Sequence, residues 1–354
     1  VRHIEGKGGE IVGAPYIGSY GLVLVRARLC GTVLRELLAM SEIALIDVPL
    51  RPDIGDEELS EHTIANMPQP ERPAADAPLI GVIDTGLNEH PLLEGLVAAR
   101  LAVPEALGTA DMRGHGTIVA GIAAYGDIRE CIDRRTFAAP VRLVSVRVVN
   151  DGGAFDDKQK VPEQMRGAVT ALAARGCRVI NLSLGDGSHI PFAGGRVPEW
   201  AAELDTLARE LDVVIVVSAG NARRPWGPEP SAIVTAYPGY LTMPENRLLD
   251  PAMAAIVLTV GALAHGNGLR PDAGDGPQVR ALPVADEPTP ITRPGPGVDG
   301  AIKPEFVDHG GTVVYNGHSD ALITGKHWTT AGMLSLSPDY LKSLFTAGTG
   351  TSFA

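Results

Sequence analysis

Five strongly apolar segments constrain the fold of this chain more than any other feature. Each is apolar at successive positions rather than at alternate ones, and amphipathic helical segments lie between several of them. Strands buried on both faces have this pattern, which is typical of a parallel sheet covered by helices. The segments are residues 79–83, 141–149, 177–184, 213–217 and 256–263. The sequence therefore predicts an α/β domain with a mostly parallel central sheet over residues 79–354.

Helical patterns fall at residues 115–125, 161–175 and 198–210, and Pro162 suits the first turn of the second of these segments. In sheets of this kind the reactive groups collect at the carboxyl ends of the strands. Residues 222–251 and 265–300 are rich in Gly, Pro and Asp. We interpret them as long loops or insertions.

The first 78 residues have a different organisation. Residues 20–28 and 43–49 have strand patterns, and residues 33–40 have a helical pattern between them. We expect a small α+β module over residues 1–50. Residues 51–78 are acidic and rich in proline, which is typical of an extended, mobile linker. A domain boundary is predicted within that linker.

Composition limits the partners and the compartment. The net charge is −12, which argues against nucleic acid as the main partner because phosphate binding needs clustered Lys and Arg. No apolar run approaches the length needed to cross a bilayer, so no membrane partner is expected. The three cysteines, Cys30, Cys131 and Cys177, lack paired spacing and are interpreted as buried free thiols. They favour a reducing, cytoplasmic location over secretion.

Three short blocks carry residue types suited to nucleophilic catalysis, and they centre on Asp84, His115 and Ser352. The blocks read IDTG, RGHGTIVAG and GTSFA. A serine hydroxyl is a weak nucleophile until a base takes its proton, and histidine titrates near neutrality. A carboxylate on the other ring nitrogen fixes the histidine tautomer and stabilises the imidazolium. The neighbouring glycines are expected to leave room for substrate backbone: Gly86, Gly114, Gly116 and Gly350.

A fourth block, SAGN, follows the apolar segment 213–217 and ends at Asn221. A side-chain amide at the end of a strand can donate a hydrogen bond to the negative oxygen that develops during acyl transfer. Asn221 is therefore a candidate oxyanion donor.

The blocks of Asp84, His115 and Ser352, in that order along the chain, together with SAGN, resemble the signatures of subtilisin-like (S8-type) serine peptidases. The resemblance covers about residues 79–354 apart from the two insertions, and it implies a subtilisin-like three-layer fold. It implies a serine endopeptidase that cleaves protein or peptide substrates through an acyl-enzyme. In that role Ser352 is the nucleophile, His115 the general base and acid, Asp84 the residue that orients His115, and Asn221 the oxyanion donor.

The resemblance also implies where substrate binds. The segment NLSLG resembles the family segment whose backbone pairs with substrate, and SAG resembles the opposite wall of the primary specificity pocket. These blocks supply Ser183, Leu184, Gly185, Ser218, Ala219 and Gly220. More loosely, the module over residues 1–50 resembles the family's propeptide, which acts as a chaperone and inhibitor.

Two departures from the family pattern are visible. The interval between His115 and Ser352 is long, so insertions are expected. The sequence stops two residues after Ser352, so the domain is expected to be incomplete at its C-terminus and to lack the helix that follows the nucleophile. No cofactor is required. Asp156 and Asp157 are candidates for a structural calcium ion, but nothing in the sequence fixes its ligands.

Two other functions compete with the main one. Asp84-Thr85-Gly86 also suits an aspartic peptidase, but that site needs two carboxylates and the sequence has only one such block. A catalytically weak or inactive pseudopeptidase that serves as an interaction module is the second alternative. The remaining histidines, among them His90, are interpreted as loop or cap residues. The sequence gives no indication of oligomeric state.

Overall fold

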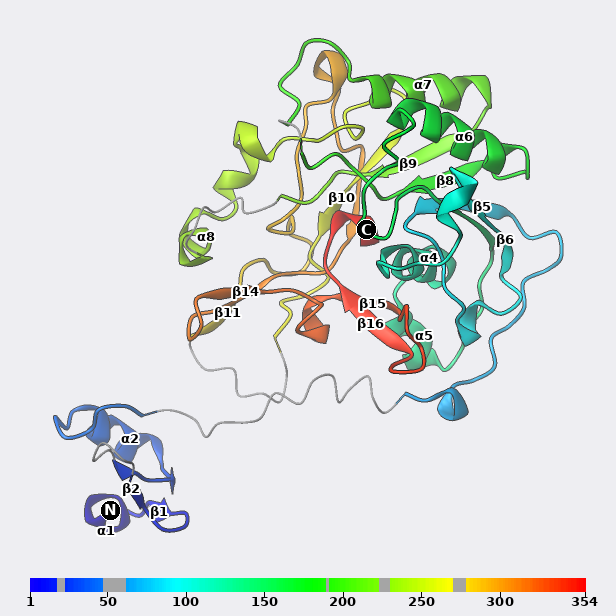
Figure 1. Cartoon of the computed structure of the whole chain (residues 1–354). Helices are drawn as coiled ribbons and strands as arrows, with labels where there is room; N and C mark the ends of the chain where they lie inside the picture. Colours follow the sequence, from blue (N-terminus) through cyan, green and yellow to red (C-terminus); the bar gives the residue numbers. More distant parts are fainter. Residues whose placement is uncertain (18–22, 47–61, 189–190, 223–229, 270–277) are drawn as a thin grey trace. The chain divides into compact units, whose positions relative to one another are not determined.

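The computed structural model describes residues 1–17, 23–46, 62–188, 191–222, 230–269 and 278–354. The chain divides into two compact units, Val1–Gly55 and Asp56–Ala354. All four chemical blocks belong to the larger unit, shown from cyan to red in Figure 1.

A seven-stranded sheet forms the centre of the larger unit, in the order β12-β10-β9-β8-β5-β7-β6. Every pair of neighbouring strands in it is parallel, which confirms the predicted α/β fold class. The strands are β5 (Leu79–Asp84), β6 (Val97–Ala102), β7 (Arg142–Arg147), β8 (Val179–Leu182), β9 (Val214–Ser218), β10 (Leu258–Leu263) and β12 (Phe306–His309).

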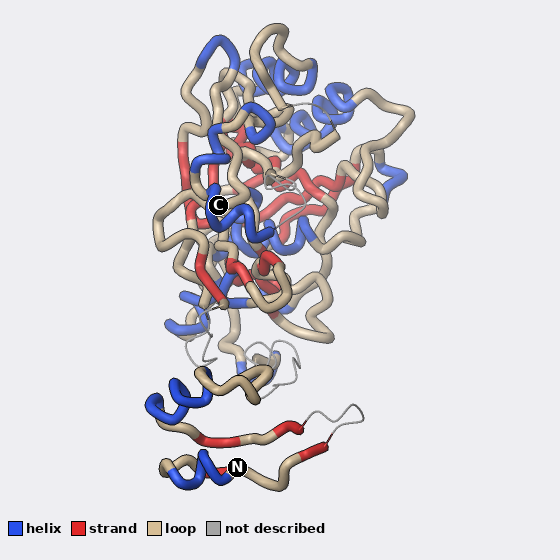
Figure 2. The backbone as a smooth tube through the Cα atoms, turned by 90° about the vertical axis from the view of Figure 1, so that its left-hand side faces the viewer, coloured by secondary structure: helices blue, strands red, loops and turns tan. Residues whose placement is uncertain are grey.

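Helices cover both faces of this sheet and give three layers. Helices α6 (Val161–Ala173) and α7 (Glu199–Glu210) lie together over one face, and α4 (His115–Tyr125) and α5 (Ile128–Arg134) lie on the other side (Figures 1 and 2). Successive side chains of β5 point to opposite faces of the sheet. Ile83 packs in the core beneath α6 and α7, and Val82 packs in the core beneath α4. Burial on both faces is the physical reason for the continuous apolar runs.

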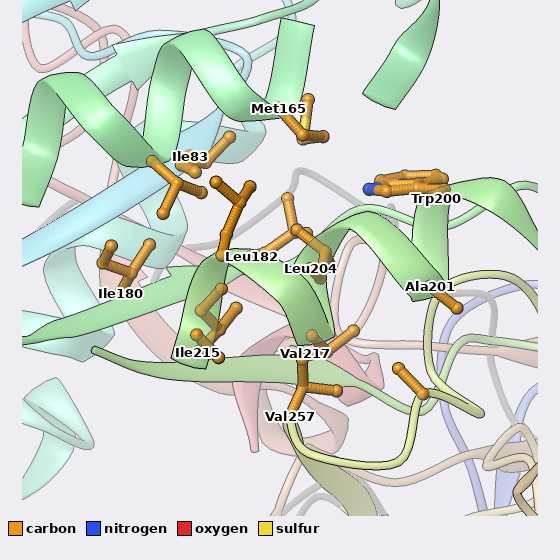
Figure 3. Packing of buried hydrophobic residues seen from close by; sticks show 14 of the residues in the cluster. Ile83, Met165, Ile180, Leu182, Trp200, Ala201, Leu204, Ile215, Val217 and Val257 are labelled. Atoms are coloured by element: carbon orange, nitrogen blue, oxygen red, sulfur yellow. The ribbon is translucent and has the colours of Figure 1, made fainter. Parts of the chain in front are cut away.

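The core beneath α6 and α7 is built from branched aliphatic side chains of the central strands and from the inner faces of the two helices. Figure 3 shows Leu182 of β8 and Val217 of β9 close to Leu204 of α7, with Trp200 and Met165 alongside. Leu182, Leu204 and Val217 are wholly buried. This packing fixes the carboxyl ends of β8 and β9, from which two candidate substrate segments emerge.

The core beneath α4 includes an antiparallel pair, β15 (Met333–Leu336) and β16 (Phe345–Gly348). Phe345 stacks on Phe137 with a centroid separation of 6.2 Å. The chain leaves β16 and enters a single 3₁₀ turn, η8 (Thr351–Phe353), whose Phe353 is buried in the same core. Core packing therefore holds the residues on both sides of Ser352.

Parts of the regions interpreted as insertions form a small substructure together with residues 314–323. Helix α8 (Pro230–Ala236) packs with β13 (Val314–Asn316) and β14 (Ala321–Ile323), and β13 also pairs with β11 (Val279–Ala281). Ile233, Tyr240 and Leu241 make its core. The other short 3₁₀ turns are η1 (Ile64–Asn66), η2 (Pro91–Leu93), η3 (Glu105–Leu107), η4 (Gly239–Thr242), η5 (Pro244–Asn246), η6 (Val298–Gly300) and η7 (Thr329–Ala331).

The smaller unit contains two helices and two short antiparallel strand pairs. Its helices are α1 (Arg2–Gly6) and α2 (Gly31–Leu38), which overlaps the predicted helix, and its paired strands are β1 (Glu10–Ile11) with β4 (Ala27–Arg28), and β2 (Tyr16–Ile17) with β3 (Val23–Leu24). The strand predicted at 20–28 is interrupted between β3 and β4, and residues 20–22 lie outside the described residues. The strand predicted at 43–49 is not formed at 43–46, and its remainder lies outside the described residues.

Part of the segment predicted as a mobile linker packs on the larger unit. Glu71 donates its backbone N–H to the carbonyl of Phe137 at 2.7 Å, and Met67 packs against the core beneath α4. The ring of His62 meets that of Phe345 edge-on at 5.7 Å. Residues 62–78 are therefore held by contacts that the proline-rich composition does not reveal. Residues 51–61 lie outside the described residues.

The three cysteines differ in exposure. Cys177 is buried as predicted, Cys131 is half-buried and Cys30 is exposed, so the prediction of a buried thiol is wrong for Cys30. Cys30 lies at the N-cap of α2, where backbone N–H groups of Val33 and Thr32 lower the pKa of its thiol. Among the described residues, no helix is long and apolar enough to span a bilayer.

His90 is a buried cap residue whose ring links two segments. Its Nδ1 accepts from the N–H of Leu92 at 3.1 Å, so the proton lies on Nε2, which donates to the carbonyl of Leu344 at 2.9 Å. Burial lowers the pKa of His90 to about 4, although its bond to the Leu344 carbonyl acts in the opposite direction. The neutral ring is therefore the form that the fold stabilises.

We expect the free energy of unfolding to fall as acid is added, because the unfolded histidine takes up a proton first. The contribution of His90 is complete above pH 6.5 and is lost as the pH falls toward about 4. Between about pH 7.5 and 4.5 this amounts to about 2.5 kcal/mol. Urea unfolding of the native protein and of His90→Gln at both pH values measures it. The native protein should lose more stability than the variant, and equal losses would contradict the assignment.

Candidate active site

Asp84 is the last residue of β5, and its side chain is wholly buried. Its Oδ1 accepts from the N–H of Thr85 at 2.8 Å and lies 2.7 Å from Nδ1 of His115. Because a carboxylate only accepts, Nδ1 carries the proton in this bond. Nε2 of His115 is then left as the basic nitrogen.

His115 is the first residue of α4, and 31% of its side chain is exposed. Burial lowers the pKa of its imidazole, but the charge and the hydrogen bond of Asp84, together with the charge of Asp111, raise it more. The net effect is a pKa above the ordinary value of 6.5. The site therefore favours a protonated imidazole, which is the form that appears when a histidine acts as a base.

The glycines beside these residues have a packing role. A Cβ on Gly116 would lie 2.2 Å from the carbonyl oxygen of Gly86, so the first turn of α4 can meet the turn after β5 only with glycine there. Gly86 has φ +117°, and a Cβ on it would lie 2.7 Å from the carbonyl oxygens of Thr109 and Ala110. We expected Gly86 and Gly116 to leave room for substrate backbone. The space beside them is instead occupied by backbone atoms of the chain itself.

Ser352 lies in η8 next to α4 and is half-buried. Its Oγ donates to the carbonyl of Ser183 at 3.3 Å. The ring of the adjacent Phe353 lies 5.7 Å from the imidazole of His115. The fold thus brings Ser352 beside the Asp84–His115 pair, with its hydroxyl turned toward Ser183.

Asn221 follows β9 and meets the same turn as Ser352. Its Oδ1 accepts from the N–H of Thr351 at 2.9 Å and from the Thr351 hydroxyl at 3.1 Å. These two donors fix the orientation of the amide, because Oδ1 must face them. The Nδ2 group therefore points away from Thr351 as a donor.

The two segments assigned to substrate leave neighbouring strands at the same edge of the sheet. Ser183, Leu184 and Gly185 follow β8, and Ser218, Ala219 and Gly220 end or follow β9, which pairs with β8 in parallel. Both segments contact the Ser352 turn: Ser183 Oγ donates to the carbonyl of Ser352 at 3.4 Å, and the N–H of Gly220 donates to Thr351 Oγ1 at 3.0 Å.

The candidate calcium residues have other interactions. Asp156 accepts from the backbone N–H of Lys158 at 3.1 Å. Among the described residues, Asp157 belongs to no group of possible metal ligands. Within the described ranges, no group of three or more His, Cys, Asp or Glu side chains could hold a metal ion.

Asp111 and Thr85 are site residues that the sequence reasoning missed. Asp111 is 3% exposed and accepts hydrogen bonds at the start of α4, and Thr85 joins it to the turn after Asp84. A carboxylate a few residues ahead of a helix start is a capping signal, and it could have identified Asp111.

Comparison with known proteins identifies the family of this chain. The family model for the subtilase family, Peptidase S8, matches residues 75–354. Among curated proteins, the uncharacterized protein y4bN of Sinorhizobium fredii is 47% identical over 195 residues, which cover 55% of this chain and 45% of that protein. Mycosin-4 of Mycobacterium tuberculosis is 31% identical over 238 residues, which cover 64% of this chain and 46% of mycosin-4.

The chain thus spans less than half the length of these relatives. A solved structure described as an S41 psychrophilic protease has a TM-score of 0.48 and 22% identity, and the match covers 78% of this chain and 73% of that one. The resemblance found in the sequence blocks is confirmed by the family model, and the chain belongs to the subtilase family of peptidases.

Proposed function

We propose that this chain is a serine endopeptidase in which Ser352 is the nucleophile, His115 the general base and acid, and Asp84 the residue that orients His115. The observation that carries the proposal is the 2.7 Å bond between Nδ1 of His115 and the wholly buried carboxylate of Asp84, beside the Ser352 turn. This arrangement leaves Nε2 of His115 as the basic nitrogen, with Ser352 in the adjacent turn, and peptide-bond cleavage through an acyl-enzyme requires a base and a serine hydroxyl of this kind.

In the proposed reaction, the Ser352 hydroxyl turns from the Ser183 carbonyl toward Nε2 of His115. As Oγ attacks the scissile carbonyl carbon, its proton passes to Nε2, and Asp84 stabilises the imidazolium. The imidazolium then gives this proton to the leaving amine, and the C–N bond breaks to leave the acyl-enzyme. A water molecule then attacks the acyl carbon and gives a proton to Nε2 of His115. The bond between the acyl carbon and Ser352 Oγ breaks, the imidazolium returns this proton to Oγ, and the acid is released.

We assign Asn221 as the side-chain donor to the oxyanion. Because Thr351 holds Oδ1 of the amide, Nδ2 is already oriented when negative charge develops on the substrate oxygen. Such preorganised donors act mainly in the transition state.

Asn221→Ala should lower kcat by about 10²- to 10³-fold with little change in KM, because the lost donor serves the transition state more than the bound substrate. Steady-state kinetics on a fluorogenic peptide measure both constants. Asn316→Ala, in β13 of the insertion substructure, is the matched control and should retain native kinetics. A rise in KM with unchanged kcat would contradict the assignment of Asn221 as the oxyanion donor.

For the substrate we propose an extended stretch of polypeptide. The segments Ser183–Gly185 and Ser218–Gly220 leave adjacent parallel strands, and each makes a hydrogen bond to the turn that carries Ser352. Backbone groups at strand ends can pair with a peptide by strand addition, which needs no particular substrate side chain.

Hydrolysis of fluorescently labelled casein tests the proposed function. We expect activity that phenylmethylsulfonyl fluoride abolishes and pepstatin does not affect, since the first reagent modifies an activated serine and the second inhibits paired carboxylates. Inhibition by pepstatin but not by phenylmethylsulfonyl fluoride would favour an aspartic peptidase in which Asp84 is a catalytic carboxylate.

A further inference from the structure

The most heavily hydrogen-bonded carboxylate near the site is that of Asp111, a residue outside the three proposed catalytic positions. Its Oδ1 accepts from Thr85 Oγ1 at 2.7 Å, from the N–H of Gly114 at 2.7 Å and from the N–H of Arg113 at 3.2 Å. Its Oδ2 accepts from both the N–H and the hydroxyl of Thr117 at 2.8 Å. A carboxylate that is 3% exposed is costly to bury unless it is satisfied in this way.

We propose that Asp111 is a positioning residue for His115. With both of its carboxylate oxygens, Asp111 holds the first turn of α4 against the Asp84–Thr85 turn. The inference deepens the proposed function and rests on it, because it assigns how the two members of the catalytic pair are held in register.

Thr85 provides the link between the two turns. Its hydroxyl donates to Asp111 and accepts from the N–H of Gly116 at 2.8 Å. The residue after Asp84 is thereby joined directly to the residue after His115, and through Asp111 to Gly114 and Thr117. A displacement of the helix start relative to β5 would have to stretch these bonds together with the Asp84–His115 bond.

The backbone at Asp111 is itself held in place by hydrogen bonds. Asn88 accepts from its N–H at 2.8 Å and donates to its carbonyl at 3.0 Å. The buried side chain of Arg147 donates to the carbonyl of Ala110 at 2.7 Å. The backbone that carries the carboxylate is therefore anchored to the loop after β5 and to β7. Because the backbone of Asp111 is anchored, its carboxylate can determine the position of the helix start. A mobile carboxylate would instead move with the helix.

Asp111 also places a second negative charge near the imidazole. Among the described residues, the charged groups that act on the His115 ring are the carboxylates of Asp84 and Asp111. Both raise the pKa of His115, against the effect of burial. Loss of the Asp111 charge should therefore lower the pKa of His115, in addition to any effect on the position of the ring.

The first test is Asp111→Asn. The amide keeps one accepting oxygen and must lose the hydrogen bonds of the other, together with the charge. We expect kcat to fall about 10²-fold, because a shift of about 1 Å in a reacting group costs that much, with KM changed less than about threefold. We also expect the pKa of His115, followed by NMR of the ring, to fall. The ring measurement needs no turnover, so it reports on Asp111 even if the protein does not hydrolyse peptides.

Asp127→Asn is the matched control. Asp127 is the N-cap of α5 and accepts from the N–H of Arg129 at 3.0 Å, so the same substitution removes the charge from a helix start that does not carry His115. Because asparagine is also a good N-cap, this control should retain native kcat and native His115 pKa with little change in melting temperature. If Asp111→Asn behaves like Asp127→Asn, Asp111 is only a helix cap and the inference is overturned.

Thr85 gives a second test that does not depend on the folding of the Asp111 variant. Thr85→Val is isosteric and removes the linking hydroxyl, whereas Thr85→Ser retains it. We expect Thr85→Val to lower kcat about 10-fold or more and Thr85→Ser to restore most of it. Native kcat in Thr85→Val would contradict the link between the two turns.

Discussion

Replacing Ser352 with alanine is expected to lower kcat for peptide hydrolysis by about 10⁶-fold. The hydroxyl is the only group in the proposed mechanism that forms the covalent acyl bond. The fold should be unaffected, because the hydroxyl makes one 3.3 Å bond to Ser183 while the adjacent Thr351 and Phe353 supply the buried contacts. Active-site kinetics, with circular dichroism to verify folding, measure the effect.

The control for this variant is Ser343→Ala. The Ser343 hydroxyl also donates to a backbone carbonyl, that of Phe345 at 2.9 Å, so the same bond type is lost away from the site. Ser343→Ala should retain native activity. A Ser352→Ala variant that keeps most of the native rate would show that another residue is the nucleophile.

Asp84→Asn is expected to lower kcat by about 10⁴-fold. The asparagine amide can donate to Nδ1 of His115, which moves the ring proton to Nε2 and leaves no base facing Ser352. The variant also loses the negative charge that stabilises the imidazolium. Because Asp84 lies wholly inside the protein, solvent cannot replace that charge.

The pH dependence separates the two effects of Asp84. In the native protein kcat/KM should rise with pH through a His115 pKa above 6.5, because only the neutral ring is a base. In Asp84→Asn the residual activity should rise at lower pH, since the carboxylate that raised the pKa is gone. The matched control is Asp286→Asn, which breaks an exposed Asp–His pair with a 2.9 Å separation from His309. It should leave rate and profile unchanged, and an unshifted profile in Asp84→Asn would contradict the assigned role of Asp84.

The central strands could be predicted from the sequence, but the edge strands of the same sheet could not. β5, β7, β8 and β9 are buried on both faces, so their residues are apolar at successive positions. β12 is an edge strand, and Phe306 and Val307 are more than half exposed. β6, at the other edge, mixes half-buried and exposed positions. Without two-sided burial neither has a continuous apolar run. In the smaller unit, two-residue strands are too short to show any period.

The site divides in a similar way. Asp84 and Asn221 could be predicted as functional because each follows an apolar strand, and strand ends are where such sheets carry chemistry. Asp111 and Thr85 could not be found by the same reasoning. Their proposed role depends on the hydrogen bond between Thr85 and Asp111, which joins turns far apart in the chain, and a single sequence shows no pattern for such a bond. The position of Asp111 ahead of the helix start indicates only a cap. The packing role of Gly116 likewise depends on a three-dimensional approach of two turns.

Labelling with a fluorophosphonate probe tests the central claim most directly, because the probe forms a stable bond only with a serine hydroxyl that a neighbouring base has activated. Mass spectrometry of the digested protein locates the adduct. We predict one adduct, on Ser352, which is absent in Ser352→Ala and strongly reduced in His115→Ala. An adduct on another residue, or equal labelling in the native protein and in His115→Ala, would contradict the activation of Ser352 by the Asp84–His115 pair.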